Sequence, residues 1–555
     1  MVNFNEIKTR NDLAIFLDIP LKKLTYILYV KKPSNYYNSF TINKKNGEAR
    51  TINAPTGDLK QIQIKFAQSL YEFKKSINEQ SKIKTNISHG FEKNKNILTN
   101  AKNHVNKKFI INIDLEDFFD SFHFGRVRGY FEKNKHINLP VEVATIIAQL
   151  TCYEGKLPQG APTSPIITNM ICEILDQRLI HLAKEFKLYY TRYADDLTFS
   201  TNDKMILDKY DLFLNRIKSE IIKFGLSINN KKTRLIYNSS RQEVTGLIVN
   251  KKINIEKEYY KKTRAMADNL YKYGEFTVKE ERGTIKQLEG RFSFINQIDK
   301  FNNTHNKEKK TNNKDKIKFW ELNAREKEYQ KFLLYKYFYL NQRPMIVTEG
   351  KTDSIYIKAA LKNLFKEYPK LIEKKEGKFS FKISFFKRTN RMKYFFNIHH
   401  HGADTLINIY NFYTGSNNFP NYYKYLKAKS GEINQNPIFI LFDNEQNKNG
   451  KPLQKIKQNI GIKDKIVGSR QIKGNLYILT NPLVKGLAEC EIEDLFDDAV
   501  LNVELNNKLF SREDKFDNKE FFGKKFFADY INRNYRKINF DSFRPLLDEM
   551  CKRID

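Results

Sequence analysis

The chain has 555 residues, and 98 Lys and Arg against 64 Asp and Glu give it a formal net charge of +34. This excess of positive charge is far beyond what solubility requires and favours a polyanionic partner, most simply nucleic acid. Four scattered cysteines without CxxC spacing argue against a disulfide framework and a thiolate zinc site. The N-terminus lacks the apolar core of a signal peptide, and no apolar run approaches the ~18 residues of a membrane span, so we expect a cytoplasmic protein.

The N-terminal segments predict short helices followed by a basic hairpin. Residues 6–35 have the spacing of amphipathic helices, and residues 40–52 predict a strand, a turn at Gly47 and a second strand. Lys44, Lys45 and Arg50 would set cations over a nucleoside triphosphate or a template backbone, and the fork of Arg suits phosphate oxygens. A solvated basic hairpin is the alternative interpretation.

Two segments further along the chain suit a nucleotide site. Residues 110–119 predict an apolar strand that ends near Asp114 and runs into a helix. A carboxylate at a strand end can join a metal site on the same sheet, although an N-cap Asp is equally natural there. Residues 157–165 predict a rigid loop, punctuated by Pro and Gly, before a helix at 166–184. Such a loop offers backbone N–H groups to a nucleotide.

Residues 189–200 predict a β-hairpin with Asp195 and Asp196 at its tip. Two like charges side by side on a tight turn repel, and each resists ionisation beside the other. A divalent cation such as Mg²⁺ removes this penalty, and phosphoryl transfer needs cations on the attacking and leaving oxygens. The alternative is a solvated turn, since Asp is a common turn residue.

Together these segments resemble reverse transcriptases. The Asp114 strand, the loop LPQGAPTSP, the YADD turn and the segment GLSIN followed by Lys232 and Thr233 occur in that family's order. The resemblance implies an α+β right-hand polymerase with fingers, a ferredoxin-like palm and a helical thumb, using dNTPs. It implies three catalytic carboxylates that hold Mg²⁺: Asp114, Asp195 and Asp196. It also implies roles for Phe119 (checking the sugar 2′ position), Gln159 (near the templating pair), Arg50 (triphosphate contact) and Lys232 (protonating the leaving pyrophosphate, with Lys231 as competitor).

Two further elements are similar to those of retron reverse transcriptases. They are the NAxxH element at 100–104 and the VTG element at 244–246. The resemblance implies that the enzyme recognises its cognate non-coding RNA, primes from a 2′-OH of an internal guanosine and makes a branched multicopy single-stranded DNA. It assigns RNA recognition to Asn100, His104, Val244, Thr245 and Gly246. The chain shows no RNase H module, so host RNase H is expected to remove the template.

The middle of the chain predicts a thumb and a linker. Residues 255–300 alternate basic and apolar positions at helical spacing, which suits a thumb that grips a duplex; a solvated basic helix is the alternative. Residues 302–313 have almost no apolar content and predict an exposed insertion or linker. Helical periodicity resumes over 322–340.

A second candidate site begins after residue 344. Residues 345–353 predict a buried strand, an acidic turn and a helix, and residues 438–445 predict another buried strand that ends in Asp443 and Glu445. Carboxylates at the ends of parallel strands line the ligand crevice of open α/β sheets, although capped strand ends are the plain alternative. Together the segments resemble a Toprim domain, through the EGxxD turn at 349–353 and a DxD strand end. Glu445 stands where that pattern has its second Asp, and Glu493 is a candidate additional ligand.

These patterns predict five regions. They are fingers and palm at 1–240, a thumb at 241–300, a linker and connecting helix at 301–343, an α/β, Rossmann-like Toprim domain at 344–499, and an extension of unassigned role at 500–555.

Three hypotheses about function follow. The first is a retron polymerase with a fused Toprim nuclease that serves anti-phage defence, with Glu349 as acid/base and Asp443 and Glu445 as Mg²⁺ ligands. The second keeps the polymerase but gives the Toprim-like domain only nucleic-acid binding. The third, a group II intron-like reverse transcriptase, is disfavoured by the NAxxH and VTG elements and by the Toprim-like segment. A homo-oligomer is left open.

Overall fold

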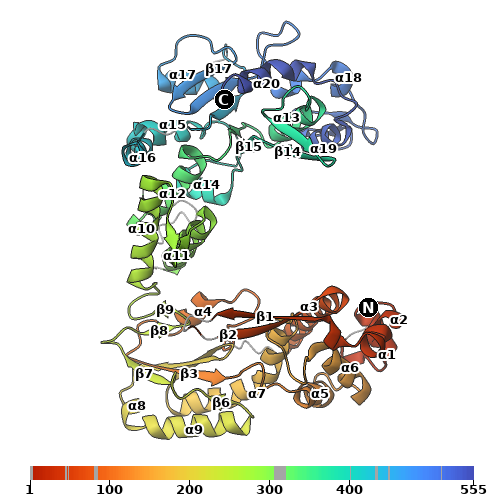
Figure 1. The fold of residues 1–555 in the computed structure, drawn as a ribbon, viewed down its shortest axis with the longest axis vertical. Coiled ribbons are helices and arrows are strands. Elements are labelled where there is room, and N and C mark those ends of the chain that lie inside the picture. The colour runs from red at the N-terminus through yellow and green to blue at the C-terminus, as the bar shows by residue number, and fades with distance from the viewer. Residues whose placement is uncertain are drawn as a thin grey trace. The chain divides into compact units, whose positions relative to one another are not determined.

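The computed structural model describes residues 4–43, 47, 49–80, 86–305, 321–400, 402–431, 435–447, 450–513 and 515–554. The chain forms two compact units, Met1–Lys257 and Glu258–Asp555. The second unit begins beyond residue 240, where we placed the end of the palm, and it contains the helices where we expected the thumb (Figure 1). Lys44, Lys45 and residues 306–320 of the predicted linker lie outside the described residues.

The first unit is built on an antiparallel sheet whose central strand is β3 (Phe109–Glu116). This strand pairs on one side with β5 (Asp196–Thr201), which pairs in turn with β4 (Tyr189–Tyr193). On its other side β3 pairs with β6 (Ser227–Ile228) and β7 (Arg234–Tyr237). Aliphatic side chains at alternate positions of β3 pack in the core with helices of the unit, and Figure 1 shows α8 and α9 on one side of the sheet. The chain path therefore matches the α+β palm that the sequence predicts.

Helices and a hairpin surround this sheet. The predicted basic hairpin is confirmed: β1 (Tyr37–Asn43) pairs antiparallel with β2 (Ala49–Pro55). The helices and short strands of this unit are α1 (Arg10–Phe16), α2 (Leu21–Thr25), α3 (Gly57–Gln80), α4 (Ile97–Lys102), α5 (Phe124–Lys133), α6 (Val141–Thr151), α7 (Ser164–Glu185), α8 (Met205–Asp208), α9 (Tyr210–Lys223), β8 (Glu243–Val244) and β9 (Leu247–Ile248).

A buried ion pair attaches the β4–β5 hairpin to α7. The Arg192 guanidinium, fully buried in β4, donates to both carboxylate oxygens of Asp176 on α7, at 2.8–3.2 Å. It also donates to the Asn169 side chain at 3.0 Å and to the Ala194 carbonyl in the turn at 3.3 Å. The Tyr190 hydroxyl donates to Asp176 at 2.9 Å. One charge network therefore fixes the strand, the helix and the turn that carries the paired acids.

The second unit has a five-stranded sheet in the order β15-β12-β16-β18-β17. Its strands are β12 (Met345–Val347), β15 (Ser384–Phe385), β16 (Ile438–Phe442), β17 (Ser469–Lys473) and β18 (Leu476–Thr480), and all neighbours are parallel except β17 with β18. Alternate residues of β16 enter two different cores, Ile438 and Ile440 on one face, Phe439 and Leu441 on the other. A continuous apolar run is what a strand covered on both faces requires. This arrangement agrees with the predicted α/β class.

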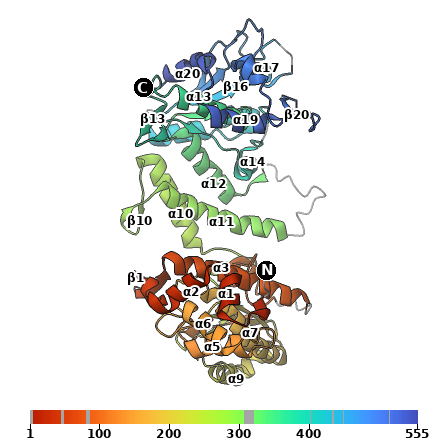
Figure 2. The ribbon, with the colours of Figure 1, turned by 90° about the vertical axis from the view of Figure 1, so that its right-hand side faces the viewer.

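One face of that sheet shares its core with the helices expected to form the thumb. These are α10 (Lys257–Tyr273) and α11 (Ile285–His305), which join α12 (Ala324–Leu334), π-helix η6 (Tyr335–Tyr339), α14 (Asn390–Phe396), α15 (Ile407–Thr414) and α16 (Tyr422–Ser430). The Phe292 ring on α11 stacks on Tyr329 of α12, with centroids 5.4 Å apart, and Tyr329 contacts Phe395 of α14. Figure 2 shows α12 between α11 and α14. The described part of the predicted connecting segment is therefore a core element.

The opposite face of the sheet is covered by α13 (Asp353–Asn363) and by the C-terminal segment. That segment supplies α19 (Lys524–Asn534) and α20 (Arg544–Cys551), and α19 packs against α13. Phe527, Ile531 and Leu547 are fully buried there. Residues 500–555, to which the sequence assigned no role, thus complete the core of the second unit.

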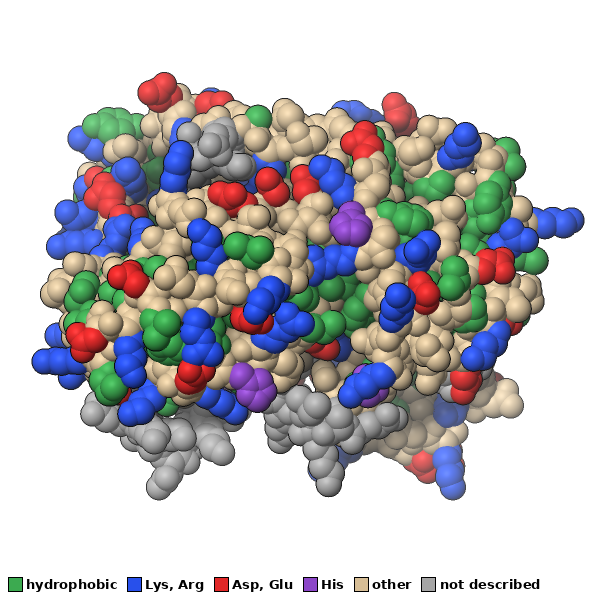
Figure 3. All heavy atoms as spheres, turned by 90° about the horizontal axis from the view of Figure 1, so that it is seen from below, with side chains coloured by type: hydrophobic (Ala, Val, Ile, Leu, Met, Phe, Trp, Pro, Cys, Tyr) green, Lys and Arg blue, Asp and Glu red, His purple; other side chains and the backbone are tan. Residues whose placement is uncertain are grey.

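The positive charge is spread over the surface that Figure 3 shows. On that face, Lys and Arg side chains lie among Asp, Glu and apolar side chains and do not gather into one patch. A local concentration of unpaired cations elsewhere is therefore more informative than the net charge.

We expect Asp176→Ala to lower the free energy of unfolding of the first unit by about 3–5 kcal/mol, because it leaves the Arg192 charge buried without its partner. The matched control is Glu79→Ala, which breaks the exposed Lys75–Glu79 pair and should cost less than about 1 kcal/mol. Native-state hydrogen exchange of the β4 and β5 amides measures both. Equal small losses would show that the ion pair does not anchor the hairpin.

Candidate active sites

The predicted palm carboxylates meet at the middle of the first sheet. Asp114 on β3 lies opposite Asp196 on β5, and the Leu115 N–H donates to the carbonyl of Asp195 at 3.0 Å. Ala194, in the turn, has a φ of 57°, a left-handed conformation that is uncommon for a residue with a side chain. The Cβ that a side chain would add at Gly90 would lie 2.5 Å from the Ala194 nitrogen, so only glycine fits beneath this turn.

Burial and mutual repulsion set the electrostatics of this cluster. Burial, then the charges of Asp195 and Asp114, raise the pKa of Asp196 to about 7. Burial also raises the pKa of Asp195, with Asp114 adding to the effect and Arg50 opposing it. The Lys232 ammonium donates to both oxygens of Asp114, at 2.9 and 3.1 Å. A lysine thus supplies positive charge to an acidic cluster that needs it.

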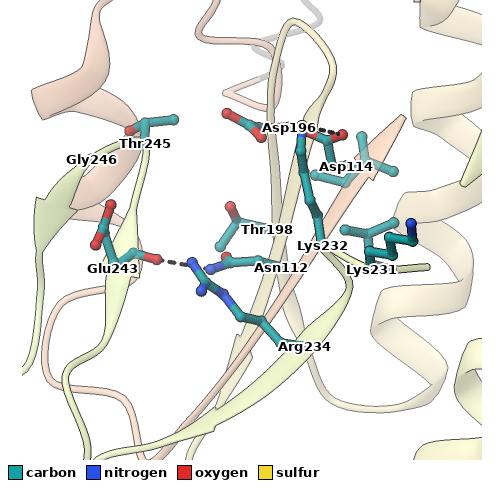
Figure 4. A pocket seen from close by; sticks show the side chains of 12 residues that line it. Asn112, Asp114, Asp196, Thr198, Lys231, Lys232, Arg234, Glu243, Thr245 and Gly246 are labelled. Carbon is teal, nitrogen blue, oxygen red and sulfur yellow. Dashed lines mark hydrogen bonds and ion pairs between the residues drawn. The ribbon is translucent and has the colours of Figure 1, made fainter. Parts of the chain in front are cut away.

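A polar pocket of about 300 Å³ opens beside these acids (Figure 4). Asp114, Asp196 and Lys232 line one part of it, and Thr245 and Gly246 of the VTG element line another. The Thr245 hydroxyl and the Asn112 amide oxygen are buried and have no hydrogen-bond partner among the described residues. Thr245 and Gly246 of the VTG element therefore line the same pocket as Asp114 and Asp196.

The other predicted palm residues lie on neighbouring elements. Arg50 is exposed on β2, and its charge reaches Asp195. The carbonyl of Gln159 accepts a 2.8 Å hydrogen bond from the Asn53 N–H, so the 157–165 loop is attached to β2. Gly160 has a φ of 116° there. Phe119 is half-buried and packs against Phe91 and Phe118.

The NAxxH element lies against the VTG element. Helix α4 packs on β8 and β9 and also on β4. Asn100, His104 and Val244 are fully buried. The two ring nitrogens of His104 each lie 2.7 Å from a hydroxyl, Ser200 on β5 and Thr191 on β4. Burial lowers the pKa of His104 to about 3, so the ring is neutral.

The second candidate site lies at the carboxyl ends of three adjacent parallel strands. Glu349 follows β12, Asp443 follows β16 and Asn481 follows β18. The Asp443 N–H donates to the Glu349 carboxylate at 3.5 Å, and the Asp443 carboxylate accepts from Asn481 at 2.8 Å and from the Ile492 N–H at 3.2 Å. The topology therefore brings together the two acids that the sequence separates by more than 90 positions.

Asp353 closes the acidic turn that precedes α13. Its carboxylate accepts from the Gly350 N–H at 2.6 Å. A Cβ at Gly350 would lie 2.5 Å from an oxygen of Asp353, which explains the glycine. Burial, with added repulsion from Asp353 and Glu445, raises the pKa of Glu349 to about 7. Burial, then Glu349 and Asp353, raise the pKa of Asp443 well above its usual range.

Lysines again pair with acids at this second site. Lys451 lies 2.5 Å from Glu445, and Lys524 lies 3.2 Å from the buried Glu493. Arg388 donates to the carbonyls of Thr348 and Glu349. The sequence motifs did not point to Lys524, because it lies in a basic, aromatic segment without a motif. Its packing on α13 through α19 is what brings it to the acids.

Divalent ions suit the donor groups of both clusters, since carboxylate oxygens are the ligands that Mg²⁺ prefers. In the palm, Asp114 and Asp196 on paired strands and Asp195 in the adjoining turn repel one another, and such a cation would relieve the repulsion. Across the described residues, no three His, Cys, Asp or Glu side chains lie close enough to hold a metal ion as they are arranged here.

Within the same residues, no helix combines the length and apolar character that crossing a bilayer requires.

Comparison with known proteins agrees with the palm geometry. Residues 42–259 match the family described as "Reverse transcriptase (RNA-dependent DNA polymerase)". The chain is 36% identical to the retron Ec86 reverse transcriptase of Escherichia coli over 293 residues, which cover 52% of this chain and 84% of that protein. It is 31% identical to the retron Mx162 reverse transcriptase of Myxococcus xanthus over 53% of this chain and 64% of that protein. A solved telomerase from Candida albicans aligns with 54% of this chain and 60% of its own, at 12% identity and a TM-score of only 0.31.

Asp195→Asn and Asp196→Asn should each abolish DNA synthesis while leaving the melting temperature equal or higher. The acids are placed to hold cations, and removing one charge relieves repulsion in the metal-free protein. Primer extension and thermal melting on the same samples test this. Asp211→Asn, on the exposed face of α9, serves as the control. Ample extension by either palm variant would refute the assignment.

Proposed function

Since this chain belongs to the retron reverse transcriptases, we propose that it copies part of its own structured RNA into branched multicopy single-stranded DNA. Family membership makes it an RNA-directed DNA polymerase. The proposed substrates are dNTPs and the cognate RNA, and the first strand starts from a 2′-OH of an internal guanosine. The reaction takes place in the cytoplasm, and host RNase H removes the copied template.

The observation that carries the polymerase assignment is that Asp114 and Asp196 lie opposite each other on paired strands beside a polar pocket, with Asp195 in the adjoining turn. These three carboxylates would hold Mg²⁺, which supplies activation of the priming hydroxyl and charge neutralisation at the leaving pyrophosphate. Lys232, whose ammonium already reaches Asp114, is the donor of a proton to that pyrophosphate. Arg50 contacts the triphosphate, Gln159 lies near the templating pair and Phe119 checks the sugar.

Recognition of the cognate RNA is assigned to the NAxxH and VTG elements. The difference in burial among their residues supports two different roles. Thr245 and Gly246 line the pocket and are the residues that contact RNA. Asn100, His104 and Val244 are buried, so they position the pocket and the hairpin instead of contacting RNA directly.

For the second unit we propose a Toprim-type nuclease that acts as the effector of anti-phage defence. Its support is the placement of Glu349 and Asp443 at the ends of adjacent parallel strands, with Asp353 holding the acidic turn. Glu349 serves as acid/base, and Asp443 and Glu445 would hold Mg²⁺ for phosphodiester cleavage. The fold of the unit suits this role, since ligands bind open α/β sheets at these strand ends.

A second candidate function is nucleic-acid binding without cleavage. It is favoured by Glu445, which stands where a Toprim domain has an Asp and is paired with Lys451 at 2.5 Å. A carboxylate that must first break an ion pair with a lysine binds a metal ion more weakly than an unpaired carboxylate does. The two candidates differ in whether the Glu349 carboxylate is needed.

The two retron elements should respond differently to substitution. Thr245→Val replaces a side chain that lines the pocket and removes a buried hydroxyl without a partner among the described residues, so self-primed synthesis on the cognate RNA should fall more than extension of a generic annealed primer. His104→Leu leaves two buried hydroxyls unpaired, which costs about 1–3 kcal/mol, so both reactions should fall together with the melting temperature. The assay compares both templates for each variant. Parallel losses for Thr245→Val would contradict the RNA-contact role.

Glu349→Gln separates the two activities. The amide keeps the side-chain volume but cannot carry the charge or readily shuttle a proton. The variant should make branched DNA at the normal level, as shown by sequencing nucleic acid that copurifies with it, and should lose both nuclease activity and phage protection. The matched control is Glu373→Gln on the surface hairpin of the same unit. Cleavage and protection that persist in Glu349→Gln would refute the nuclease and leave the binding function.

A further inference from the structure

Three lysines for which no acidic partner occurs among the described residues lie on α13 and just after β15, two elements that adjoin the second acidic site. Lys358 and Lys362 are four positions apart on α13, the helix that begins at Asp353, so both side chains lie on one helix face. Lys387 follows β15 and lies two residues after Phe385, the ring that the Lys358 ammonium contacts. Like charges at this spacing destabilise a helix slightly, so the arrangement has no evident benefit for folding.

The contacts of these lysines leave their charges available. The Lys358 ammonium lies 4.4 Å from the ring centre of Phe385 on β15, and Lys362 lies over Tyr535 and donates to the side chain of Asn532. Among the described residues, no carboxylate forms an ion pair with any of the three lysines, whereas Lys451, Lys455 and Lys524 of the same unit are all paired. Burial, then Lys387 and Lys362, lower the pKa of Lys358, which agrees with a crowded cluster of cations.

The surrounding sequence is strongly basic. Between residues 358 and 393 there are twelve Lys and Arg and three Asp and Glu. Two of those three acids already have partners, Glu367 with Arg544 and Glu373 with Lys375. The stretch that runs from α13 through β15 into α14 therefore carries a local excess of positive charge.

α13 and β15, which carry or precede the three lysines, adjoin the elements that hold the second acidic site. β15 is the neighbour of β12, whose end carries Glu349, and α13 starts at Asp353. An acidic crevice repels the phosphates of nucleic acid unless cations at its rim hold the backbone.

We propose that Lys358, Lys362 and Lys387 form a binding site for the phosphodiester backbone of a nucleic acid strand and deliver that strand to the second acidic site. The delivery step rests on the proposed nuclease, but the binding step does not. Binding to phosphates carries no base preference, so the site takes strands of any sequence.

The test uses the full chain and a triple variant, Lys358→Gln, Lys362→Gln and Lys387→Gln, which removes the charges but keeps most of each side chain. The KM for cleavage of a single-stranded DNA oligonucleotide should rise roughly tenfold with kcat nearly unchanged, and the salt dependence of KM should weaken by about one unit per lysine. DNA synthesis should stay at the native level. The control is Lys473→Gln, an exposed lysine on β17 at the opposite edge of the sheet.

Amine labelling distinguishes failure of this proposal from failure of the nuclease. In full-chain Glu349→Gln protein, addition of the oligonucleotide should protect Lys358, Lys362 and Lys387 from an amine-reactive reagent and leave Lys473 labelled. Protection without any cleavage by the native protein would refute the nuclease but support this binding site. Equal labelling of the three lysines with and without the oligonucleotide, or a KM unchanged in the triple variant, would overturn the proposal.

Discussion

The paired acids of the palm depend on an ion pair that lies beneath them. Arg192 and Asp176 are almost wholly buried, and burying two charges is favourable only when hydrogen bonds satisfy their remaining donors and acceptors. Tyr190, Asn169 and the Ala194 carbonyl do so here. Because the guanidinium reaches the turn itself, the position of the carboxylates is set by a rigid network and not by the flexible tip of a hairpin.

Both candidate sites face the same electrostatic difficulty and meet it in the same way. Each gathers acids at strand ends, where burial and repulsion disfavour the ionised forms. In each, lysines from later parts of the chain approach the acids: Lys232 in the palm, Lys451 and Lys524 in the second unit. A divalent cation that binds at either site would therefore compete with a lysine ammonium group. Its affinity would depend on how easily that lysine side chain can move away from the acids.

The sequence predicted those strands and turns that are determined by residues close to one another in the chain. The alternation around Asp195, the glycine of the basic hairpin and the apolar run before Asp443 each determine a strand or a turn with nearby residues, and the structure has those elements. Burial of polar residues was not predictable in this way, because it depends on distant partners. Arg192 is buried owing to Asp176 on another element, and His104 owing to hydroxyls on two strands.

The same limit applied to the C-terminal segment. Its aromatic and basic residues have no motif, and only the packing of α19 on α13 shows that Phe527 belongs to a core and that Lys524 belongs to an acidic site. The helix predicted over 322–340 is present as α12 and η6. The sequence did not show that α12 buries Tyr329 and Phe332 against α11, because that contact depends on a distant segment.

The core that α10 and α11 share with the second sheet has a genetic consequence. A stop codon anywhere between residue 306 and α14 would remove Phe395 and part or all of the helical layer against which Phe292 packs. The apolar side of α11 would then face water, and the helices expected to hold the duplex would lose their support. Truncation in this part of the gene would therefore expose the helices expected to form the thumb and remove Asp443 of the second acidic site in one step.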